Sequence, residues 1–302
     1  MFAHTVVWNQ SVMCRVIQTL DKLTSNTLTW RGAFSRLDVV RSASKRSSEL
    51  FAVRWAMVWI ASVVVVIASA AYDWWGRWGY LVYCSACAAP LVLRPLLLPA
   101  ACDAKVPWYE RHAVKANLWQ GIFGFVGNYW YTHYFYRVLK ADYTFEAHRL
   151  NDVPISMFCM THAYFMFYHA LSNAAIRFVR TRYERGLGRL ALEMTLVQGM
   201  SYLTAVMEAV TIAAFPYYDF EDRYSALVYG SAFYGIYFLA SFPMFFRMDE
   251  WSVAAEFSGS GAAQWRYTLK YAAVDAAACA MLVLCALDFV RLLLGVELFA
   301  PH

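Results

Sequence analysis

Seven long apolar stretches, separated by shorter polar segments, run along the chain. They cover residues 52–72, 79–100, 117–138, 153–175, 190–214, 225–246 and 270–294. Each is close to the roughly 20 residues that an α-helix needs to cross a bilayer. A membrane β-barrel would show short alternating segments separated by turns, which this pattern does not resemble. The pattern therefore predicts an all-α, polytopic integral membrane helical bundle with about seven transmembrane helices.

The second apolar stretch leaves a bundle of six helices open as the alternative. Pro90, Arg94 and Pro95 interrupt it, so we expect it to be kinked or in part re-entrant. Ahead of the first stretch, the chain lacks the continuous apolar run of a secretory signal peptide. We expect residues 1–50 to form a basic cytosolic segment, amphipathic or disordered, followed by a transmembrane helical domain at 51–302.

Composition agrees with a bilayer environment. The 302 residues are 61% hydrophobic and 16% charged, whereas about a quarter of an ordinary soluble domain is charged. The net charge of +5 is too small to predict a nucleic-acid partner. Most of the 26 Lys and Arg residues lie in the N-terminal segment and in the loops before the third, after the fourth and after the sixth stretch. The positive-inside rule places these segments, and so the N-terminus, in the cytosol.

The sequence motifs give little support for metal binding or nucleotide binding. Cys84 and Cys87 have the CxxC spacing, but no second pair completes a zinc site. The chain has no Gly-rich phosphate loop, nucleophile elbow or HExxH motif. We therefore predict no metal site.

Glu208 is the main candidate for chemistry, because an ionisable group at membrane depth is costly and usually faces a cavity or a partner. It lies in the fifth stretch, with Thr204 and Thr211 on the same helix face. Desolvation disfavours the charged form, so we expect an uncharged carboxyl group. Such a group can donate a proton to a weakly basic carbon. An interhelical hydrogen bond is the alternative role.

Histidine and amide side chains supply the other polar candidates. His162 and His169 are seven residues apart in the fourth stretch and share a stripe with Asn173. They line a cavity or, as the alternative, pack as buried histidines. One helical face of the third stretch carries Asn117, Gln120, Gly124, Asn128 and Tyr131, with His133 close to the end of that stretch.

Depth in the bilayer groups six of these side chains at the far-side end of the bundle. They are Asn128, Tyr131, His133, His162, Glu208 and, from the loop after the fifth stretch, Asp219. An apolar pocket with a few polar groups at this end suits a long apolar ligand with a polar head. In the seventh stretch, Asp288 and Arg291 are three residues apart and are expected to form a structural ion pair.

Six motifs carry a resemblance to a known family. They are Lys115–Trp119 (KANLW), Gly127–Tyr136 (GNYWYTHYFY), His148–Pro154 (HRLNDVP), Tyr168–Asn173 (YHALSN), Phe215–Tyr218 (FPYY) and Ser241–Glu250 (SFPMFFRMDE). Together they resemble the cycloeucalenol cycloisomerases, the cyclopropylsterol isomerases of plant-type sterol synthesis. The resemblance covers about residues 43–296. Asp219 stands where the plant pattern has Glu, and Asp152 where it has a second Asn.

The resemblance implies an integral-membrane isomerase of the endoplasmic reticulum that needs no cofactor. It would open the 9β,19-cyclopropane ring of a sterol such as cycloeucalenol to give obtusifoliol. An acid must protonate the strained ring and a base must remove a neighbouring proton, while aromatic faces stabilise the cation. Our hypothesis makes Glu208 the acid and His133 or His162 the base, with Asp219 tuning the acid.

The remaining candidates are assigned to the substrate, a sterol held in the bilayer among membrane lipids. Asn128 and Tyr131 are expected to orient groups or bind water. The other expected substrate-binding residues are Trp130, Phe165, His169, Tyr217 and Tyr218. A different sterol double-bond isomerase and a non-catalytic sterol-binding membrane protein are the alternatives, and the sequence leaves the oligomeric state open.

Overall fold

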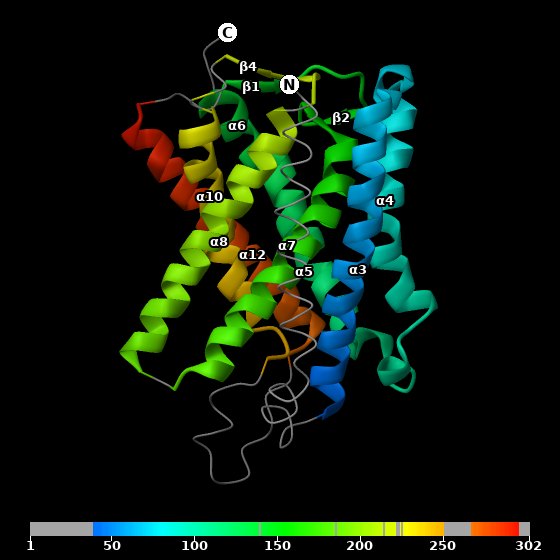
Figure 1. Ribbon diagram of the computed structural model, residues 1–302, viewed down its shortest axis with the longest axis vertical. Helices are drawn as coiled ribbons and strands as arrows, with labels where there is room; N and C mark the ends of the chain where they lie inside the picture. The colour runs from blue at the N-terminus through cyan, green and yellow to red at the C-terminus, as the bar shows by residue number, and fades with distance from the viewer. Residues whose placement is uncertain are drawn as a thin grey trace. The chain divides into compact units, whose positions relative to one another are not determined.

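A computed structural model describes residues 39–138, 140–184, 186–213, 215–221, 224, 226–250 and 267–295. The described residues from Ala43 onward form one compact unit, in which helices predominate (Figure 1). The α-helices are α3 (Val39–Ser69), α4 (Arg77–Leu97), α5 (His112–Val126), α6 (Thr132–Val138), α7 (Ile155–Arg182), α8 (Leu187–Ala213), α10 (Ser231–Phe246) and α12 (Leu269–Leu293). Short 3₁₀ turns lie at η1 (Ala71–Trp74), η2 (Ala101–Asp103) and η3 (Trp108–Glu110).

All seven apolar stretches contain helix, and five helices are long and apolar enough to cross a bilayer. These five are α3, α4, α8, α12 and the segment 227–246 that includes α10. The third and fourth stretches are helical in α5, α6 and α7, but they are not among the five. Their buried amides and histidines, such as Gln120 and His169, lower their hydropathy. The structure thus supports an all-α membrane bundle with five candidate spans and does not confirm a count of seven.

Helix α3, the first helix in the described part of the chain, extends further towards the N-terminus than the sequence indicated. Because α3 starts at Val39, the boundary expected at residue 50 falls inside it. Ser44 and Lys45 are polar, yet both are buried, which a hydropathy pattern does not anticipate. The expected cytosolic segment lies mostly outside the described residues.

The central helices are α5 and α7. Helix α5 packs against α12 and α7, α7 packs against α4 and α8, and α10 packs against α8 and α12. In Figure 1, α3 and α4 lie on one side of this centre, with α8, α10 and α12 on the other. The core between them is aromatic, and its fully buried side chains include Trp59, Trp119, Phe123, Phe238 and Phe242.

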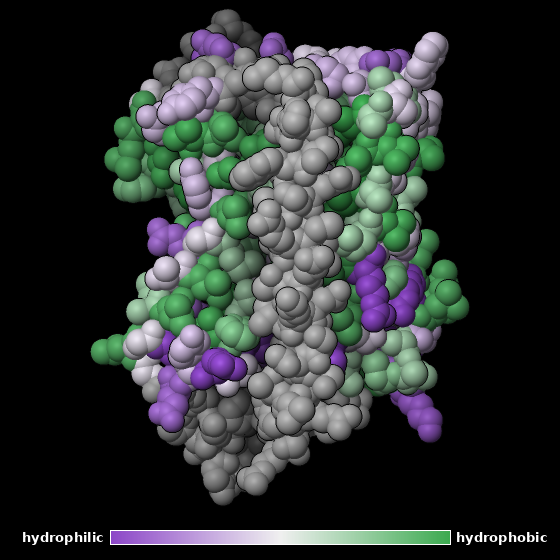
Figure 2. Space-filling view, viewed as in Figure 1, coloured by the Kyte–Doolittle hydropathy of each residue, from purple (hydrophilic) through white to green (hydrophobic). Residues whose placement is uncertain are grey.

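Apolar side chains also face outward, as a lipid solvent requires. Val65 is 65% exposed and Leu97 70% exposed. Figure 2 shows hydrophobic side chains spread over the flanks of the bundle, with hydrophilic ones most frequent towards its ends. Exposed apolar area on this scale is uncommon on soluble monomers and fits a surface in contact with acyl chains.

Helix α4 remains one helix through two prolines. Pro90 and Pro95 both lie inside it. Pro95 has no N–H to give to the carbonyl of Leu91, four residues earlier. The side chain of Asn117 supplies that donor instead, with its Nδ2 2.9 Å from the Leu91 carbonyl oxygen. An amide from a neighbouring helix therefore lets the segment stay helical without the expected re-entrant break.

Two details at one end of the bundle were not visible in the sequence pattern. The third stretch contains a π-helical turn, η4 (Gly127–Tyr131), and a second, η5 (Ala226–Gly230), precedes α10. Three segments expected to be loops, together with the first two residues of the fourth apolar stretch, form two antiparallel strand pairs. Strand β1 (Ala141–Tyr143) pairs with β4 (Tyr218–Phe220), and β2 (Arg149–Leu150) pairs with β3 (Val153–Pro154). The β1–β4 pair ties the chain after α6 to the chain after α8.

Candidate active site

A cavity lies at this end of the bundle, between the two π-turns. It holds about 800 Å³ of empty space, counting the part that is open to the surroundings. Its described lining residues are Gly127, Asn128, Thr132, Phe135, Tyr143, Thr161, Phe165, Ala205, Glu208, Ala209, Gly230, Ser231, Phe233, Tyr234 and Tyr237. Most of this lining is apolar or aromatic, so the few polar atoms in it are conspicuous.

Glu208 projects into this cavity from α8. Its Oε1 accepts a hydrogen bond of 3.0 Å from the hydroxyl of Tyr234 on α10. Its Oε2 is buried and has no hydrogen-bond partner in the part of the chain that is described. Oε1 thus fixes the orientation of the carboxyl group, and the hydroxyl of Tyr168 also interacts with this group. Oε2 itself has no partner at hydrogen-bonding geometry among the described residues, although buried polar atoms are normally paired.

Tyrosine hydroxyls surround this carboxyl group. Six of them lie close enough to interact with it electrostatically: Tyr143, Tyr164, Tyr168, Tyr218, Tyr234 and Tyr237. Only Tyr218 of these was predicted from the sequence. Helical spacing was an available signal, because Tyr164 and Tyr168 are four residues apart and Tyr234 and Tyr237 three apart, so each pair shares a face.

The amide and tyrosine predicted on the third stretch separate in the structure. Asn128 lines the cavity, but its Nδ2 donates to the Gly124 carbonyl at 2.8 Å and its Oδ1 accepts from Thr161 at 3.3 Å. The Tyr131 hydroxyl donates instead to the carbonyl of Ala280 on α12, at 2.6 Å. The π-turn explains the difference, because it adds a residue to the turn and rotates the later residues relative to a continuous α-helix.

None of the three predicted histidines is among the described lining residues. The Nε2 of His162 lies 2.8 Å from Asn117 Oδ1, and that of His169 lies 2.9 Å from Ser241 Oγ. His169 is fully buried among aromatic rings, so it packs as a core residue. His133 lies beside Tyr136, and its Nε2 is buried without a partner within the described ranges.

The remaining predicted residues, Tyr217, Tyr218, Asp219 and Trp130, differ in how deeply they are buried near the cavity. Tyr218 is buried beside Tyr143, with ring centroids 5.0 Å apart. The Tyr217 hydroxyl bonds to Asp73 at 2.8 Å, on the rim of the bundle. Asp219 is exposed on β4, and Trp130 is 45% exposed. Among the predicted site residues, the structure therefore brings Glu208, Asn128 and Phe165 together in the lining and places the others around or outside it.

A second polar cluster lies at the opposite end of the helices, where α3 and α5 begin and α7 and α10 end. Glu250, on the segment after α10, forms a salt bridge of 3.0 Å with Lys45 and another with Arg177. Arg177 also pairs with Glu49 at 2.8 Å. The Nζ of Lys45 also donates hydrogen bonds to the carbonyl oxygens of Phe246 and Met248, each at 2.7 Å.

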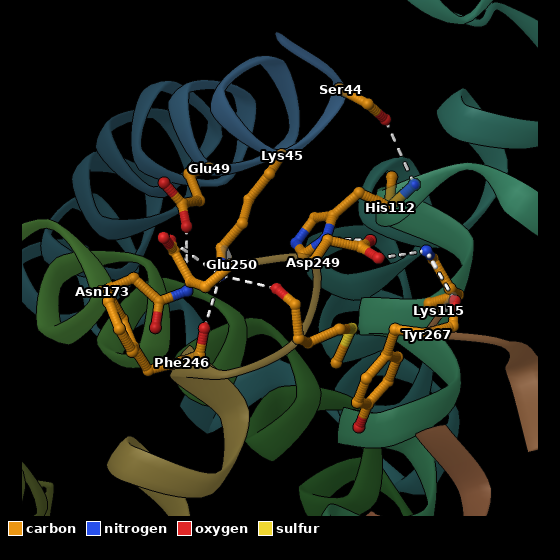
Figure 3. Close-up of polar contacts among 12 residues, drawn as sticks. Ser44, Lys45, Glu49, His112, Lys115, Asn173, Phe246, Asp249, Glu250 and Tyr267 are labelled. Atoms are coloured by element: carbon orange, nitrogen blue, oxygen red, sulfur yellow. Dashed lines mark hydrogen bonds and ion pairs between the residues drawn. The ribbon is translucent and has the colours of Figure 1, made fainter. Parts of the chain in front are cut away.

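Asp249 anchors the other half of this cluster (Figure 3). Its carboxylate lies 2.9 Å from His112 Nδ1 and 2.5 Å from Lys115 Nζ. Burial alone would raise the pKa of Asp249, but the hydrogen bond from His112 and the charge of Lys115 lower it to about 2. For Glu250 burial acts in the same upward sense, and Lys45 and Arg177 lower its pKa to about 2. Both carboxylates are therefore ionised.

This charged cluster was missed by sequence reasoning. Its residues lie at helix ends, where charges are ordinary, and nothing local shows that they are buried. Three of the family-like motifs contribute to it through Lys115, Asn173, Asp249 and Glu250. The Asp288–Arg291 pair, in contrast, was predicted and is confirmed at 2.7 Å. Across the described ranges, no three His, Cys, Asp or Glu side chains are grouped to hold a metal ion.

Comparison with curated proteins adds an independent observation. The chain is 40% identical over 255 residues to cycloeucalenol cycloisomerase from Arabidopsis thaliana, an alignment that covers 83% of this chain and 87% of the relative. A search of protein-family models finds no match. Solved structures give no match either.

Proposed function

Since the chain belongs to the cycloeucalenol cycloisomerase family and is an isomerase, we propose that it opens the 9β,19-cyclopropane ring of a sterol such as cycloeucalenol. A proton is added to the bridging methylene carbon, and the bond from that carbon to the ring fusion breaks, leaving a tertiary cation. Loss of a proton from the neighbouring carbon then forms the ring double bond of obtusifoliol. No atom is gained or lost overall.

The observation that carries this proposal is the unpaired Oε2 of Glu208 inside an aromatic cavity. Protonating a carbon requires a strong, desolvated acid that faces the substrate. Tyr234 holds the other oxygen, so the acid is oriented before the substrate arrives. The proposal makes the protonated Glu208 carboxyl group the proton donor.

The aromatic lining suits the charge that develops on the substrate. Phe165, Phe233 and Tyr237 border the cavity, and an aromatic face stabilises a desolvated cation by about 2 kcal/mol or more. An apolar wall also keeps water away from the cation, so that loss of a proton outruns addition of water.

The proton acceptor is assigned to the Glu208 carboxylate that remains after the first step. His133 is the alternative, because its Nε2 is buried and unpaired within the described ranges. Replacing His133 with Ala separates the two assignments. Retained conversion favours Glu208 as both donor and acceptor, whereas loss of conversion in a stable variant favours His133.

The decisive experiment is conversion of cycloeucalenol by Glu208→Gln, which keeps the size of the side chain and removes its proton. Loss of general acid catalysis typically costs about 10²–10⁴-fold in rate. Glu193→Gln is the matched control, because Glu193 lies on the same helix, outside the described lining, and pairs with Arg180. A well-folded Glu208→Gln protein that still converts the sterol would remove Glu208 as the donor.

Identifying the products distinguishes ring opening from the two alternatives, which are a sterol double-bond isomerase and a sterol-binding protein without chemistry. Supplying cyclopropylsterols and sterols without the cyclopropane ring distinguishes ring opening from a double-bond shift. A protein that binds sterol and converts neither class would be a sterol-binding membrane protein without chemistry.

The proposal extends to the membrane arrangement. The chain crosses the endoplasmic reticulum membrane seven times, with the N-terminus cytosolic, the cavity towards the far side and the charged cluster towards the cytosol. In support, the helical segments 112–138 and 155–182 each exceed the roughly 20 residues of a span. Cysteine labelling in segments 144–148 and 183–186 tests this, since the two should react from opposite sides.

A further inference from the structure

Ser231 carries the second unpaired polar atom of the cavity. It is the first residue of α10 and is among the lining residues. It is 1% exposed, and its Oγ has no hydrogen-bond partner in the described part of the chain. A buried hydroxyl without a partner costs free energy, so its place in a cavity wall points to a ligand.

The helix geometry explains why this hydroxyl is unpaired. A serine or threonine inside a membrane helix usually bonds to a carbonyl three or four residues earlier. Ser69 does so with Val65, and Thr211 with Met207, each at 2.7 Å. The turn before Ser231 is the π-turn η5, which has more residues per turn than an α-turn. The carbonyl four residues back is therefore displaced from its usual position beneath the side chain.

The two unpaired atoms of the cavity have different chemistry. Glu208 Oε2 belongs to a carboxyl group, which can give up a proton. A serine hydroxyl is far too weak an acid to protonate carbon, but it both donates and accepts hydrogen bonds. It is therefore suited to recognise a neutral hydroxyl group at a fixed position on an otherwise apolar ligand.

We propose that Ser231 binds the C3 hydroxyl group of the sterol and so sets which carbon of the ring system faces Glu208. This assignment rests on the proposed function for the identity of the ligand. It makes Ser231 a positioning residue that does not touch the reacting carbons. The rest of the sterol surface is apolar and fits the cavity wall in more than one orientation. One polar contact at Ser231 and one at Glu208 together select a single orientation.

The test compares cycloeucalenol with its 3-deoxy analogue, in wild type and in Ser231→Ala. A neutral hydrogen bond at a buried site corresponds to about 3–10-fold in affinity. We expect wild type to prefer the 3-hydroxy sterol by about that factor, both in equilibrium binding of the tritiated sterol and in KM. In Ser231→Ala the preference falls below about 2-fold and KM for the 3-hydroxy sterol rises by about the same factor of 3–10. We expect kcat to fall as well, because a sterol that is no longer held in one register presents the wrong carbon to Glu208 for part of the time.

Ser201→Ala is the matched control. Ser201 is also fully buried with an unpaired Oγ, but it is not among the described lining residues. We expect Ser201→Ala to keep the wild-type preference, and both variants to keep the wild-type melting temperature within a few degrees.

Two results would contradict the proposal about Ser231. One is an undiminished preference for the 3-hydroxy sterol in Ser231→Ala; the other is an equal loss of preference in Ser201→Ala. Failure of the proposed function shows differently, as sterol binding without conversion in wild type. The binding measurement still tests Ser231 in that case.

Discussion

Replacing Glu250 with Gln should destabilise the fold far more than an ordinary surface substitution. The Glu250 carboxylate joins Lys45 and Arg177 at the end of the bundle where four helices meet. Gln keeps the size of the side chain and removes its charge. Lys45, only 3% exposed, would then keep its two carbonyl partners and the attraction of Glu49, and would lose its salt bridge.

The magnitude can be worked from the electrostatics of the site. The pKa of Glu250 is lowered from 4.5 to about 2, with burial opposing the shift and the two cations producing it. That difference corresponds to about 3 kcal/mol of folding free energy at neutral pH. Removing one partner of a buried ion pair costs about 3–5 kcal/mol in general. We therefore expect a loss of about 3 kcal/mol.

Thermal unfolding of the purified protein in detergent, followed by tryptophan fluorescence, measures this loss. A change of about 3 kcal/mol lowers Tm by about 5 °C at this chain length. Glu146→Gln is the matched control, since Glu146 pairs with Arg77 at 2.9 Å but both side chains are more than half exposed. Exposed pairs contribute little, so its Tm should stay near that of wild type.

Two results would refute the reasoning. Equal Tm values for Glu250→Gln and Glu146→Gln would mean that the buried carboxylate adds no more stability than an exposed one. A gain in stability would mean that the cost of burying Glu250 exceeds the attraction of its two cations.

Three further outcomes are expected. The ionised forms of Asp249 and Glu250 stabilise the fold fully above about pH 5, and this contribution is lost as pH falls towards 2, because the ordinary pKa values of 3.8 and 4.5 are both lowered to about 2 in the folded protein. Acid unfolding should be less steep in Asp249→Asn, and an unchanged profile would contradict the assignment. Tyr131→Phe removes a buried hydrogen bond of 2.6 Å to the Ala280 carbonyl. We expect a loss of about 1 kcal/mol and a Tm lower by about 1–2 °C in the same assay, and an unchanged Tm would be the contrary result. Ala209→Phe adds a ring to the cavity wall, so sterol conversion should fall at least tenfold while Ala209→Gly stays active; an active Ala209→Phe would place the substrate elsewhere.

The amino-acid sequence by itself indicated a membrane environment and predicted where the helices lie along the chain. All seven apolar stretches contain helix, because hydrophobicity over 20 residues is a local property that needs no partner. Glu208 was identified for the same kind of reason, as a carboxyl group at a depth where one is costly. The pair Asp288–Arg291 lies within one helical turn and was equally readable.

Only the tertiary structure decided which side chains face the cavity. The π-turns η4 and η5 depend on how the helices pack and leave no mark in a hydropathy pattern. They separate Asn128 from Tyr131 and leave the Ser231 hydroxyl unpaired. His162 and His169 lie on one face of their helix as predicted. Their ring nitrogens are nevertheless hydrogen-bonded to residues of other helices, His162 to Asn117 and His169 to Ser241. The rotation of each helix about its axis is set by its neighbours. The sequence therefore predicted where the helices lie along the chain, but it could not predict which of their side chains face the cavity.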